Sequence, residues 1–269
     1  MKKKTIFLLS ALAILLIAVI TFCGLKFYRY ECEQNENIAL LNQKISTLSE
    51  ELQDLSNTYK TDKEYYEKSH QWGNGYNWLA IGNSLTWIEA YGHGICSTGV
   101  DNDYFGLVRS YLETKYPDVD AFRISAVPWE QKTSNRSTRF YLMDPQLSPT
   151  LDLVTIQLGE NVFDTTTYQQ DLTELINHIK DKCPQAEIIL IDDFWEQEIS
   201  DMRRAAAEET GVAFADLSEI RGKSEYQSRE GTAFALADGS ADIVSKAAET
   251  HPGDAGMKYI ADQIIKNLK

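Results

Sequence analysis

Three short stretches of the sequence carry residue types that together can perform acyl transfer. Ser84 follows a Gly-Asn pair at the end of an apolar run, as when a strand stops in a tight turn with an accessible hydroxyl. Asn161 follows a second apolar run, and His251 opens a His-Pro-Gly-Asp turn near the C-terminus. Brought into one site, these groups would supply a nucleophile, an oxyanion donor and a base.

Each of the three residues also has a purely structural interpretation. Gly-Asn-Ser is ordinary turn chemistry, Asn161 can be a plain turn residue, and His251 can cap the last helix. The chemical interpretation is favoured because each stretch supplies a group that the other two lack.

From Tyr76 onward, the sequence alternates between apolar runs and amphipathic stretches. The runs predict strands over residues 77–82, 121–126, 151–158, 187–192 and 212–216, and the stretches predict helices over 103–116, 167–182, 200–210 and 255–268. This alternation indicates an α/β domain with a parallel five-stranded sheet between layers of helices. Ligands of such sheets bind at the carboxyl ends of the strands, where we expect Ser84, Ala126 and Asn161.

The N-terminal 30 residues predict a membrane anchor. Three lysines precede the uncharged apolar residues 5–25, whose 21 positions would form a helix of about 32 Å, close to the roughly 30 Å of a hydrocarbon core. The apolar run is longer than that of a cleaved signal peptide. The basic flank favours a cytoplasmic N-terminus, so we expect a single-pass membrane protein whose remaining residues are extracytoplasmic.

Residues 31–60 predict a coiled-coil stalk, followed by a linker over 61–75 and the α/β domain over 76–269. Apolar residues recur there at alternating spacings of three and four, as in a heptad seam: Ile38, Leu41, Ile45, Leu48, Leu52, Leu55 and Tyr59. The narrow seam favours a parallel homodimer over the alternative, an amphipathic helix that packs on its own domain.

Composition narrows the classes of partner. The chain has 269 residues, of which 43% are hydrophobic, and a formal net charge of −14. That charge argues against a nucleic-acid partner, which would require clustered Lys and Arg. The cysteines and histidines form no metal-binding pattern, so neither a metal nor another cofactor is expected. A disulfide between Cys96 and Cys183 is compatible with the spacing but is not required by it.

Three motifs, in this order, resemble those of the SGNH (GDSL-type) hydrolase superfamily: Gly82-Asn83-Ser84-Leu85, Gly159-Glu160-Asn161 and His251-Pro252. The resemblance covers the chain from about Tyr76 to the C-terminus. It implies a flavodoxin-like, three-layer α/β/α domain with esterase, acetylesterase or related acyl-transfer activity. By this resemblance, Ser84 is the nucleophile, His251 is its base, and the oxyanion hole consists of the backbone N–H groups of Ser84 and Ala126 and the side-chain amide of Asn161.

The sequence departs from the family pattern at two positions. Ala126 stands where the family usually has a glycine, although alanine also carries an N–H group. Ala248 stands where the family places an aspartate, three residues before His251. Glu249 could orient the imidazole instead; otherwise a backbone carbonyl would do so and the enzyme would use a Ser–His dyad. Asp254 is better explained as the N-cap of the last helix.

Further residues follow predicted strand ends and are weaker candidates for substrate binding: Trp87, Trp129, Glu130, Glu160 and Trp195. The aromatic rings could stack on sugars, or they could simply pack in the core or at its rim. The two glutamates could contact substrate, or they could be solvated carboxylates.

These observations predict a membrane-anchored, extracytoplasmic serine esterase that removes O-acetyl or similar small acyl groups from glycans. Two alternatives remain open. One is a glycan O-acetyltransferase that uses the same Ser84 and His251 with a membrane partner. The other is a non-catalytic glycan-binding or scaffold protein that has lost its catalytic acid.

Overall fold

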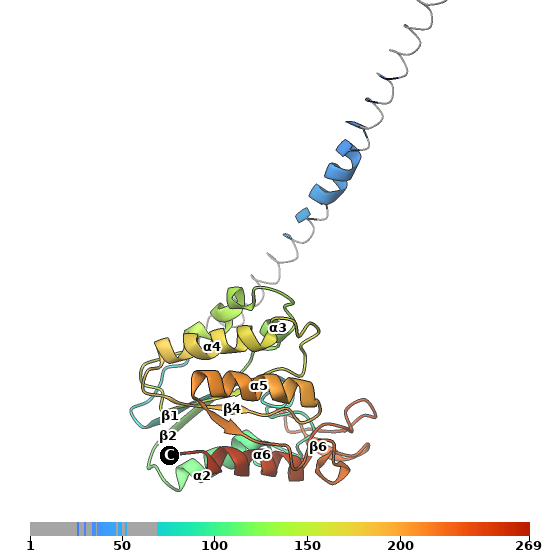
Figure 1. The fold of residues 1–269 in the computed structure, drawn as a ribbon. Coiled ribbons are helices and arrows are strands. Elements are labelled where there is room, and N and C mark those ends of the chain that lie inside the picture. The colour runs from blue at the N-terminus through green and yellow to red at the C-terminus, as the bar shows by residue number, and fades with distance from the viewer. Residues whose placement is uncertain are drawn as a thin grey trace, which may run out of the picture. The chain divides into compact units, whose positions relative to one another are not determined.

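The structure, a computed structural model, describes Lys26, Tyr30 and residues 34–35, 37–46, 48–49, 52 and 69–269. The chain divides into two compact units, residues 1–62 and 63–269 (Figure 1).

In the N-terminal unit, residues 37–46 are helical, in agreement with the heptad spacing. The described seam residues are all more than half exposed: Ile38, Leu41, Ile45, Leu48 and Leu52. Within the described residues no helix is both long and apolar enough to cross a bilayer. The predicted anchor at residues 5–25 lies outside the described residues, as do Leu55, Tyr59 and most of the linker. The anchor and the coiled coil therefore stay predictions.

The C-terminal unit contains the predicted five-stranded parallel sheet. Its strands are β1 (Tyr76–Gly82), β2 (Val119–Ser125), β3 (Leu153–Gln157), β4 (Glu187–Ile191) and β5 (Ala213–Ala215). Their order in the sheet is β2-β1-β3-β4-β5, and all neighbouring strands are parallel. The sequence-based prediction of a flavodoxin-like sheet is therefore confirmed.

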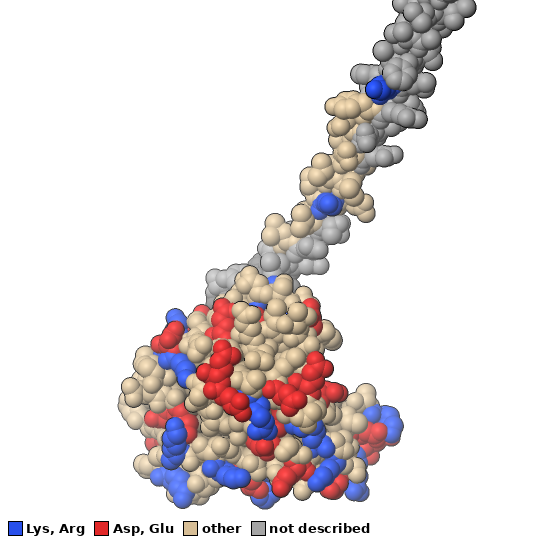
Figure 2. Space-filling view, viewed as in Figure 1, with Lys and Arg blue, Asp and Glu red and all other residues tan. Residues whose placement is uncertain are grey.

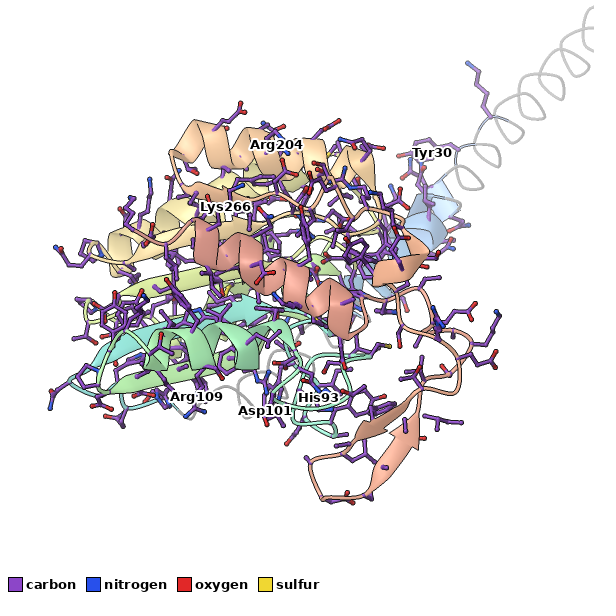
Figure 3. The ribbon with its side chains drawn as sticks, turned by 90° about the horizontal axis from the view of Figure 1, so that it is seen from below. Tyr30, His93, Asp101, Arg109, Arg204 and Lys266 are labelled. Carbon is purple, nitrogen blue, oxygen red and sulfur yellow. The ribbon has the colours of Figure 1, made fainter. Side chains whose placement is uncertain are left out.

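Helices cover both faces of this sheet. They are α2 (Tyr104–Glu113), the short α3 (Val127–Glu130), α4 (Tyr168–Lys182), α5 (Gln197–Thr210) and α6 (Asp254–Lys266), with 3-10 helices η1 (Arg136–Leu142), η2 (Asp144–Gln146) and η3 (Ser224–Tyr226). Helices α4 and α5 lie on one face and α2 and α6 on the other (Figure 1). Figure 3 shows the second face from below, with Arg109 on α2 and Lys266 at the end of α6.

The strands are apolar throughout because each is covered on both faces. Along β1, Leu79 and Ile81 pack in the core under α4 and α5, whereas Trp78 and Ala80 pack in the core under α2 and α6. Successive side chains of a strand point to opposite faces, so a run of consecutive apolar residues is what a doubly covered strand requires.

The sequence did not reveal the antiparallel hairpin formed by β6 (Ala233–Ala235) and β7 (Ala241–Ile243). Its strands are short and largely exposed, so they carry no alternating pattern. Phe234 of this hairpin packs with Cys96 in a small third core. Cys96 and Cys183 are both buried free thiols, which answers the question that their spacing left open.

The surface of the C-terminal unit carries charges of both signs. On the face shown in Figure 2, acidic and basic side chains of the described residues are interspersed.

Gly82 ends β1 at a point where the chain leaves no room for a side chain. A Cβ atom there would lie 1.7 Å from Thr86 Oγ1 and 3.0 Å from the Gln157 carbonyl oxygen. The Thr86 hydroxyl is itself held by Tyr104 Oη at 2.6 Å. Thr86 of the turn that carries Ser84 therefore packs directly against residue 82, where only glycine leaves it enough room.

We expect Gly82→Ala to destabilise the fold by about 1–3 kcal/mol or more, because the added methyl group must displace Thr86 from a packed site. Urea unfolding measures the loss. Gly99→Ala is the matched control, because a Cβ at Gly99 meets nothing within 4 Å. Equal stability of the two variants would contradict this account of the turn.

Candidate active site

The turn after β1 presents Ser84 to a cavity. The Asn83 carbonyl accepts the N–H groups of Thr86 and Trp87, both at 2.9 Å, and the Asn83 side-chain oxygen accepts the Leu85 N–H at 3.1 Å. These bonds close a single helical turn around Ser84. Ser84, half-buried, keeps its own backbone N–H free of any acceptor among the described residues.

The cavity beside Ser84 has a volume of about 410 Å³. Its lining comes from the turn after β1 and from the start of α3: Ser84, Trp87, Ile88, Glu89, Ser125, Val127 and Pro128. Most of these side chains are apolar. The lining also includes Ser84, whose hydroxyl is the nucleophile predicted from the sequence. Trp87 is thus the one predicted substrate-binding residue that lines this cavity.

His251 is held in a defined tautomer in the turn before α6. Its Nδ1 lies 3.0 Å from the Ala248 carbonyl oxygen. Because a carbonyl oxygen can only accept, Nδ1 must carry the ring proton, and the lone pair of Nε2 is then available as a base. The alternative that a backbone carbonyl orients the imidazole is the one found in this structure.

Glu249 does not orient His251. Its carboxylate pairs with Lys246 on the surface, and the acceptor on His251 Nδ1 is the carbonyl of Ala248. Asp254 is not the N-cap of α6 either, since Gly253 occupies that position. The Asp254 carboxylate instead accepts the Thr98 N–H at 2.8 Å and the Thr98 hydroxyl at 2.7 Å.

Ser84 and His251 are connected through a short series of contacts. The Ser84 carbonyl accepts the Ile95 N–H at 2.7 Å, and the next residue, Cys96, donates its thiol to the Ala248 carbonyl at 3.3 Å. That same oxygen holds the imidazole of His251. Burial raises the pKa of Cys96 to about 11, so the thiol keeps the proton that it donates. No hydrogen bond joins the Ser84 hydroxyl to His251 in the part of the chain that the structure describes.

Trp195 supports the histidine and does not line the cavity. Its ring lies edge-on to the His251 ring, with centroids 5.2 Å apart and planes at 78°. Its indole N–H donates to the Thr250 carbonyl at 2.9 Å. Trp129, also expected to bind substrate, is fully buried in the core under α4 and α5. For both tryptophans the structure favours the alternative of packing in the core or at its rim.

The N–H groups predicted to form the oxyanion hole differ in whether they already have an acceptor in the structure. The backbone N–H of Ala126 donates to the Gly82 carbonyl at 2.7 Å, as a continuation of the β1–β2 ladder, and so cannot serve an oxyanion. The next N–H along the chain, that of Val127, has no acceptor among the described residues and begins α3 beside the cavity. The N–H group without an acceptor therefore lies one residue further along the chain than the sequence predicted.

The Asn161 side chain lies at the carboxyl end of β3. Its amide nitrogen donates to Glu130 Oε2 at 2.8 Å. An amide nitrogen carries two hydrogens, so the second remains for a ligand. Among the described residues, the N–H groups of Ser84 and Val127 and the second amide hydrogen of Asn161 are donors without a protein acceptor, and they follow β1, β2 and β3 respectively.

Glu130 is buried and the Glu160 side chain is only 11% exposed, so neither is the solvated carboxylate that the sequence allowed, and neither lines the cavity beside Ser84. Glu130 is fully inaccessible, and the amide of Asn83 donates to Glu130 Oε1 at 3.0 Å and to Glu160 Oε2 at 2.6 Å. Burial raises the pKa of Glu130 above its ordinary value. Burial raises the pKa of Glu160 to about 7, and the charge of Arg203 opposes this shift.

Arg203 supplies the positive charge beneath these carboxyl groups. Its guanidinium is fully buried and lies 2.9 Å from Glu160 Oε2 and 3.3 Å from Asp193 Oδ2. It also donates to the Ile191 carbonyl at 2.8 Å. Arg203 was not among the residues predicted for the site, although an arginine between Ile199 and Ala206 on the apolar stripe of a helix is a signal of a buried charge.

Gly159 allows this approach of Arg203. Its φ is +145°, and a Cβ there would lie 2.5 Å from Arg203 Nη2 and 2.5 Å from Tyr168 Oη.

In the described residues, no group of three or more His, Cys, Asp or Glu side chains is arranged to hold a metal ion.

Chemically, the structure offers a hydroxyl at a cavity, an imidazole whose Nε2 carries the lone pair, and N–H donors in the turns that follow the neighbouring strands. A hydroxyl with a base and oxyanion donors can attack an acyl carbon and stabilise the tetrahedral intermediate. Ser84, His251 and Asn161 stay predicted catalytic residues.

A family comparison gave one match. The sequence profile described as "GDSL-like Lipase/Acylhydrolase family" matches residues 80–259. That range includes all three motifs. A comparison with curated proteins gave no match.

Solved structures with a similar fold have low sequence identity to the chain. Phospholipase A1 from Streptomyces albidoflavus is 14% identical, with 72% of this chain and 100% of that chain covered and a TM-score of 0.49. The extracellular lipase from Streptomyces rimosus is 12% identical, with coverage of 72% and 100% and a TM-score of 0.46. A two-domain esterase active on acetylated mannans is 15% identical, with coverage of 71% and 48% and a TM-score of 0.48.

Burial lowers the pKa of His251 from its ordinary value of 6.5, and the bond to Ala248 only partly opposes this. A base acts in its neutral form, so activity should fall as the pH drops through this lowered pKa. We expect the acidic limb of kcat/KM to have its midpoint below pH 6.5.

Trp195→Ala provides the comparison, because it removes a ring that shields the imidazole. The midpoint should then move up towards 6.5. His251 would be excluded as the titrating base if the midpoint of the acidic limb lay above pH 7 in the parent protein. An acidic limb whose midpoint is the same in Trp195→Ala would exclude it as well.

Proposed function

Because the chain belongs to the GDSL-like lipase/acylhydrolase family, we propose that it is a serine esterase with Ser84 as nucleophile and His251 as base. The observation that carries the proposal is the bond from His251 Nδ1 to the Ala248 carbonyl oxygen at 3.0 Å. This bond assigns the ring proton and leaves Nε2 unprotonated. Ser84 is tied to the same loop through Ile95 and Cys96.

In the first step, Ser84 Oγ attacks the acyl carbon and its proton passes to Nε2 of His251. The oxyanion accepts hydrogen bonds from the N–H groups of Ser84 and Val127 and from the amide of Asn161. The ester bond then breaks, and the departing alcohol takes the proton from Nε2. Water repeats the sequence on the acyl-enzyme: it gives a proton to Nε2, and the acid leaves as Ser84 recovers that proton.

This site uses a neutral acceptor where the family has an acid. The task of the acid in a catalytic triad is to hold the imidazole in one tautomer and orientation. The Ala248 carbonyl supplies both effects without a charge, so Ser84 and His251 work as a dyad.

We propose small acyl groups on glycans, such as O-acetyl esters, as the substrate. The supporting observations are the cavity of about 410 Å³ and the ring of Trp87 on its wall. A cavity of this size accommodates a short acyl group together with part of a sugar, and an indole ring can stack on the sugar face. Since Trp129 is buried and Trp195 packs on His251, this inference now depends on Trp87.

The proposed location is the outer side of a cell membrane. The apolar residues 5–25, with their lysine flank, support a single-pass anchor with a cytoplasmic N-terminus. The heptad spacing supports a stalk that holds the esterase domain away from the bilayer.

Ser84→Ala tests the enzyme assignment. We expect the variant to lose hydrolysis of p-nitrophenyl acetate and of an acetylated oligosaccharide by about 10⁴-fold, because no other nucleophile replaces the hydroxyl. Acetate release by the purified protein, without an added acceptor, is the measurement. Unchanged turnover in Ser84→Ala, or none in the parent protein, would leave the non-catalytic alternative. Turnover that requires a sugar acceptor would make the protein a transferase.

The stalk should associate as a parallel dimer, because Ile at positions 38 and 45 and Leu at 41 and 48 follow the a and d preferences of two-stranded coils. Leu41→Asp together with Leu48→Asp places charges in the seam and should yield a monomer. Sedimentation equilibrium of the extramembrane part measures this. The control exchanges Gln43 and Ser49, outside the seam, for alanine. A monomeric parent protein would refute the dimer.

A further inference from the structure

We propose that Glu130 is a positioning residue of the esterase site, which fixes the Asn161 amide towards the oxyanion. This inference rests on the proposed function, and it assigns to Glu130 neither substrate contact nor proton transfer. Its basis is the set of hydrogen bonds that converge on one buried carboxylate.

Three N–H donors from two strand-end turns meet at Glu130. The amide of Asn83 and the backbone N–H of Gly159 both donate to Oε1, and the amide of Asn161 donates to Oε2. Asn83 directly precedes the nucleophile Ser84. One carboxylate therefore sets the distance between the turn that carries the nucleophile and the turn that carries the oxyanion amide.

The bond to Asn161 determines which way the amide faces. A side-chain amide can rotate by half a turn about its last bond and exchange its oxygen for its nitrogen. With the carboxylate of Glu130 beside it, only the nitrogen can face Oε2, so the second N–H is aimed elsewhere. Rotation would bring the Asn161 side-chain oxygen against Oε2 of the buried Glu130, so that two acceptor oxygens would face each other.

The carboxylate is in turn held rigidly. Glu130 is the last residue of α3, which begins just after β2, and its side chain is fully buried. Burial raises the pKa of Glu130, while the hydrogen bonds from Gly159, Asn83 and Asn161, and then the charge of Arg203, favour the ionised carboxylate. Holding Asn161 before substrate arrives removes a reorganisation cost from the reaction, which is the main advantage of an oxyanion hole.

The test is a double-mutant cycle of Glu130→Gln and Asn161→Ala. A glutamine at position 130 offers one carbonyl oxygen and one NH₂ group to three N–H donors, so at least one donor loses its acceptor. We expect kcat for p-nitrophenyl acetate to fall about 10-fold or more, less than the roughly 10²–10³-fold that follows removal of an oxyanion donor. KM should change little, because the interaction strengthens in the transition state.

The cycle separates positioning from plain stability. If Glu130 acts through Asn161, Glu130→Gln should cost less than about 2-fold in the Asn161→Ala background, where its target is gone. An equal loss in both backgrounds would overturn the proposal. Glu208→Gln, an exposed glutamate on α5, is the control and should leave kcat unchanged.

A measurement without turnover keeps this proposal separable from the proposed function. The side-chain amide resonances of Asn161, assigned by NMR, should shift and exchange faster in Glu130→Gln than in Glu208→Gln. If the parent protein hydrolyses no ester but these resonances respond as expected, the function fails while the positioning contact stands. If they do not respond, the positioning role fails whatever the activity.

Discussion

The site depends on the parallel register of three strands that end at one level of the sheet. Gly82, the last residue of β1, pairs with Ser125 of β2 and with Gln157 of β3. Because the three strands leave the sheet at the same edge, the loops that follow them meet within hydrogen-bond distance. A slip of one residue would turn the side chains of a strand to the opposite face and part the loops.

The fold accepts several ionisable groups in its interior close to this edge. A buried carboxylate or guanidinium is costly unless partners compensate for the lost hydration. Arg203 therefore lies against Glu160 and Asp193 together, and Glu130 collects N–H donors. Because each of these groups depends on the others, truncating one leaves an uncompensated charge. The network beneath the nucleophile thus acts as a single unit.

The fold could be predicted from the sequence because it follows from patterns along the chain. Apolar runs such as Leu153–Gln157 and the stripe of α6 mark buried strands and helices directly. The residues beside the nucleophile could be proposed for the same reason, since Ser84 and Asn161 each follow such a run.

The hydrogen bonds between these residues, and the burial of their neighbours, could not be predicted from the sequence. Whether the N–H of Ala126 is free depends on how far the β1–β2 ladder continues, and this differs by one residue from the expectation. Burial of Trp129 and Glu130 follows from the four-residue α3, which is too short to have a periodicity. The acceptor on His251 is a backbone atom, and every residue has one. That last feature has an evolutionary consequence. No side-chain replacement at position 248 deletes the carbonyl oxygen, so the acceptor on His251 is protected from most mutations and leaves no signature in the sequence by which relatives could be recognised.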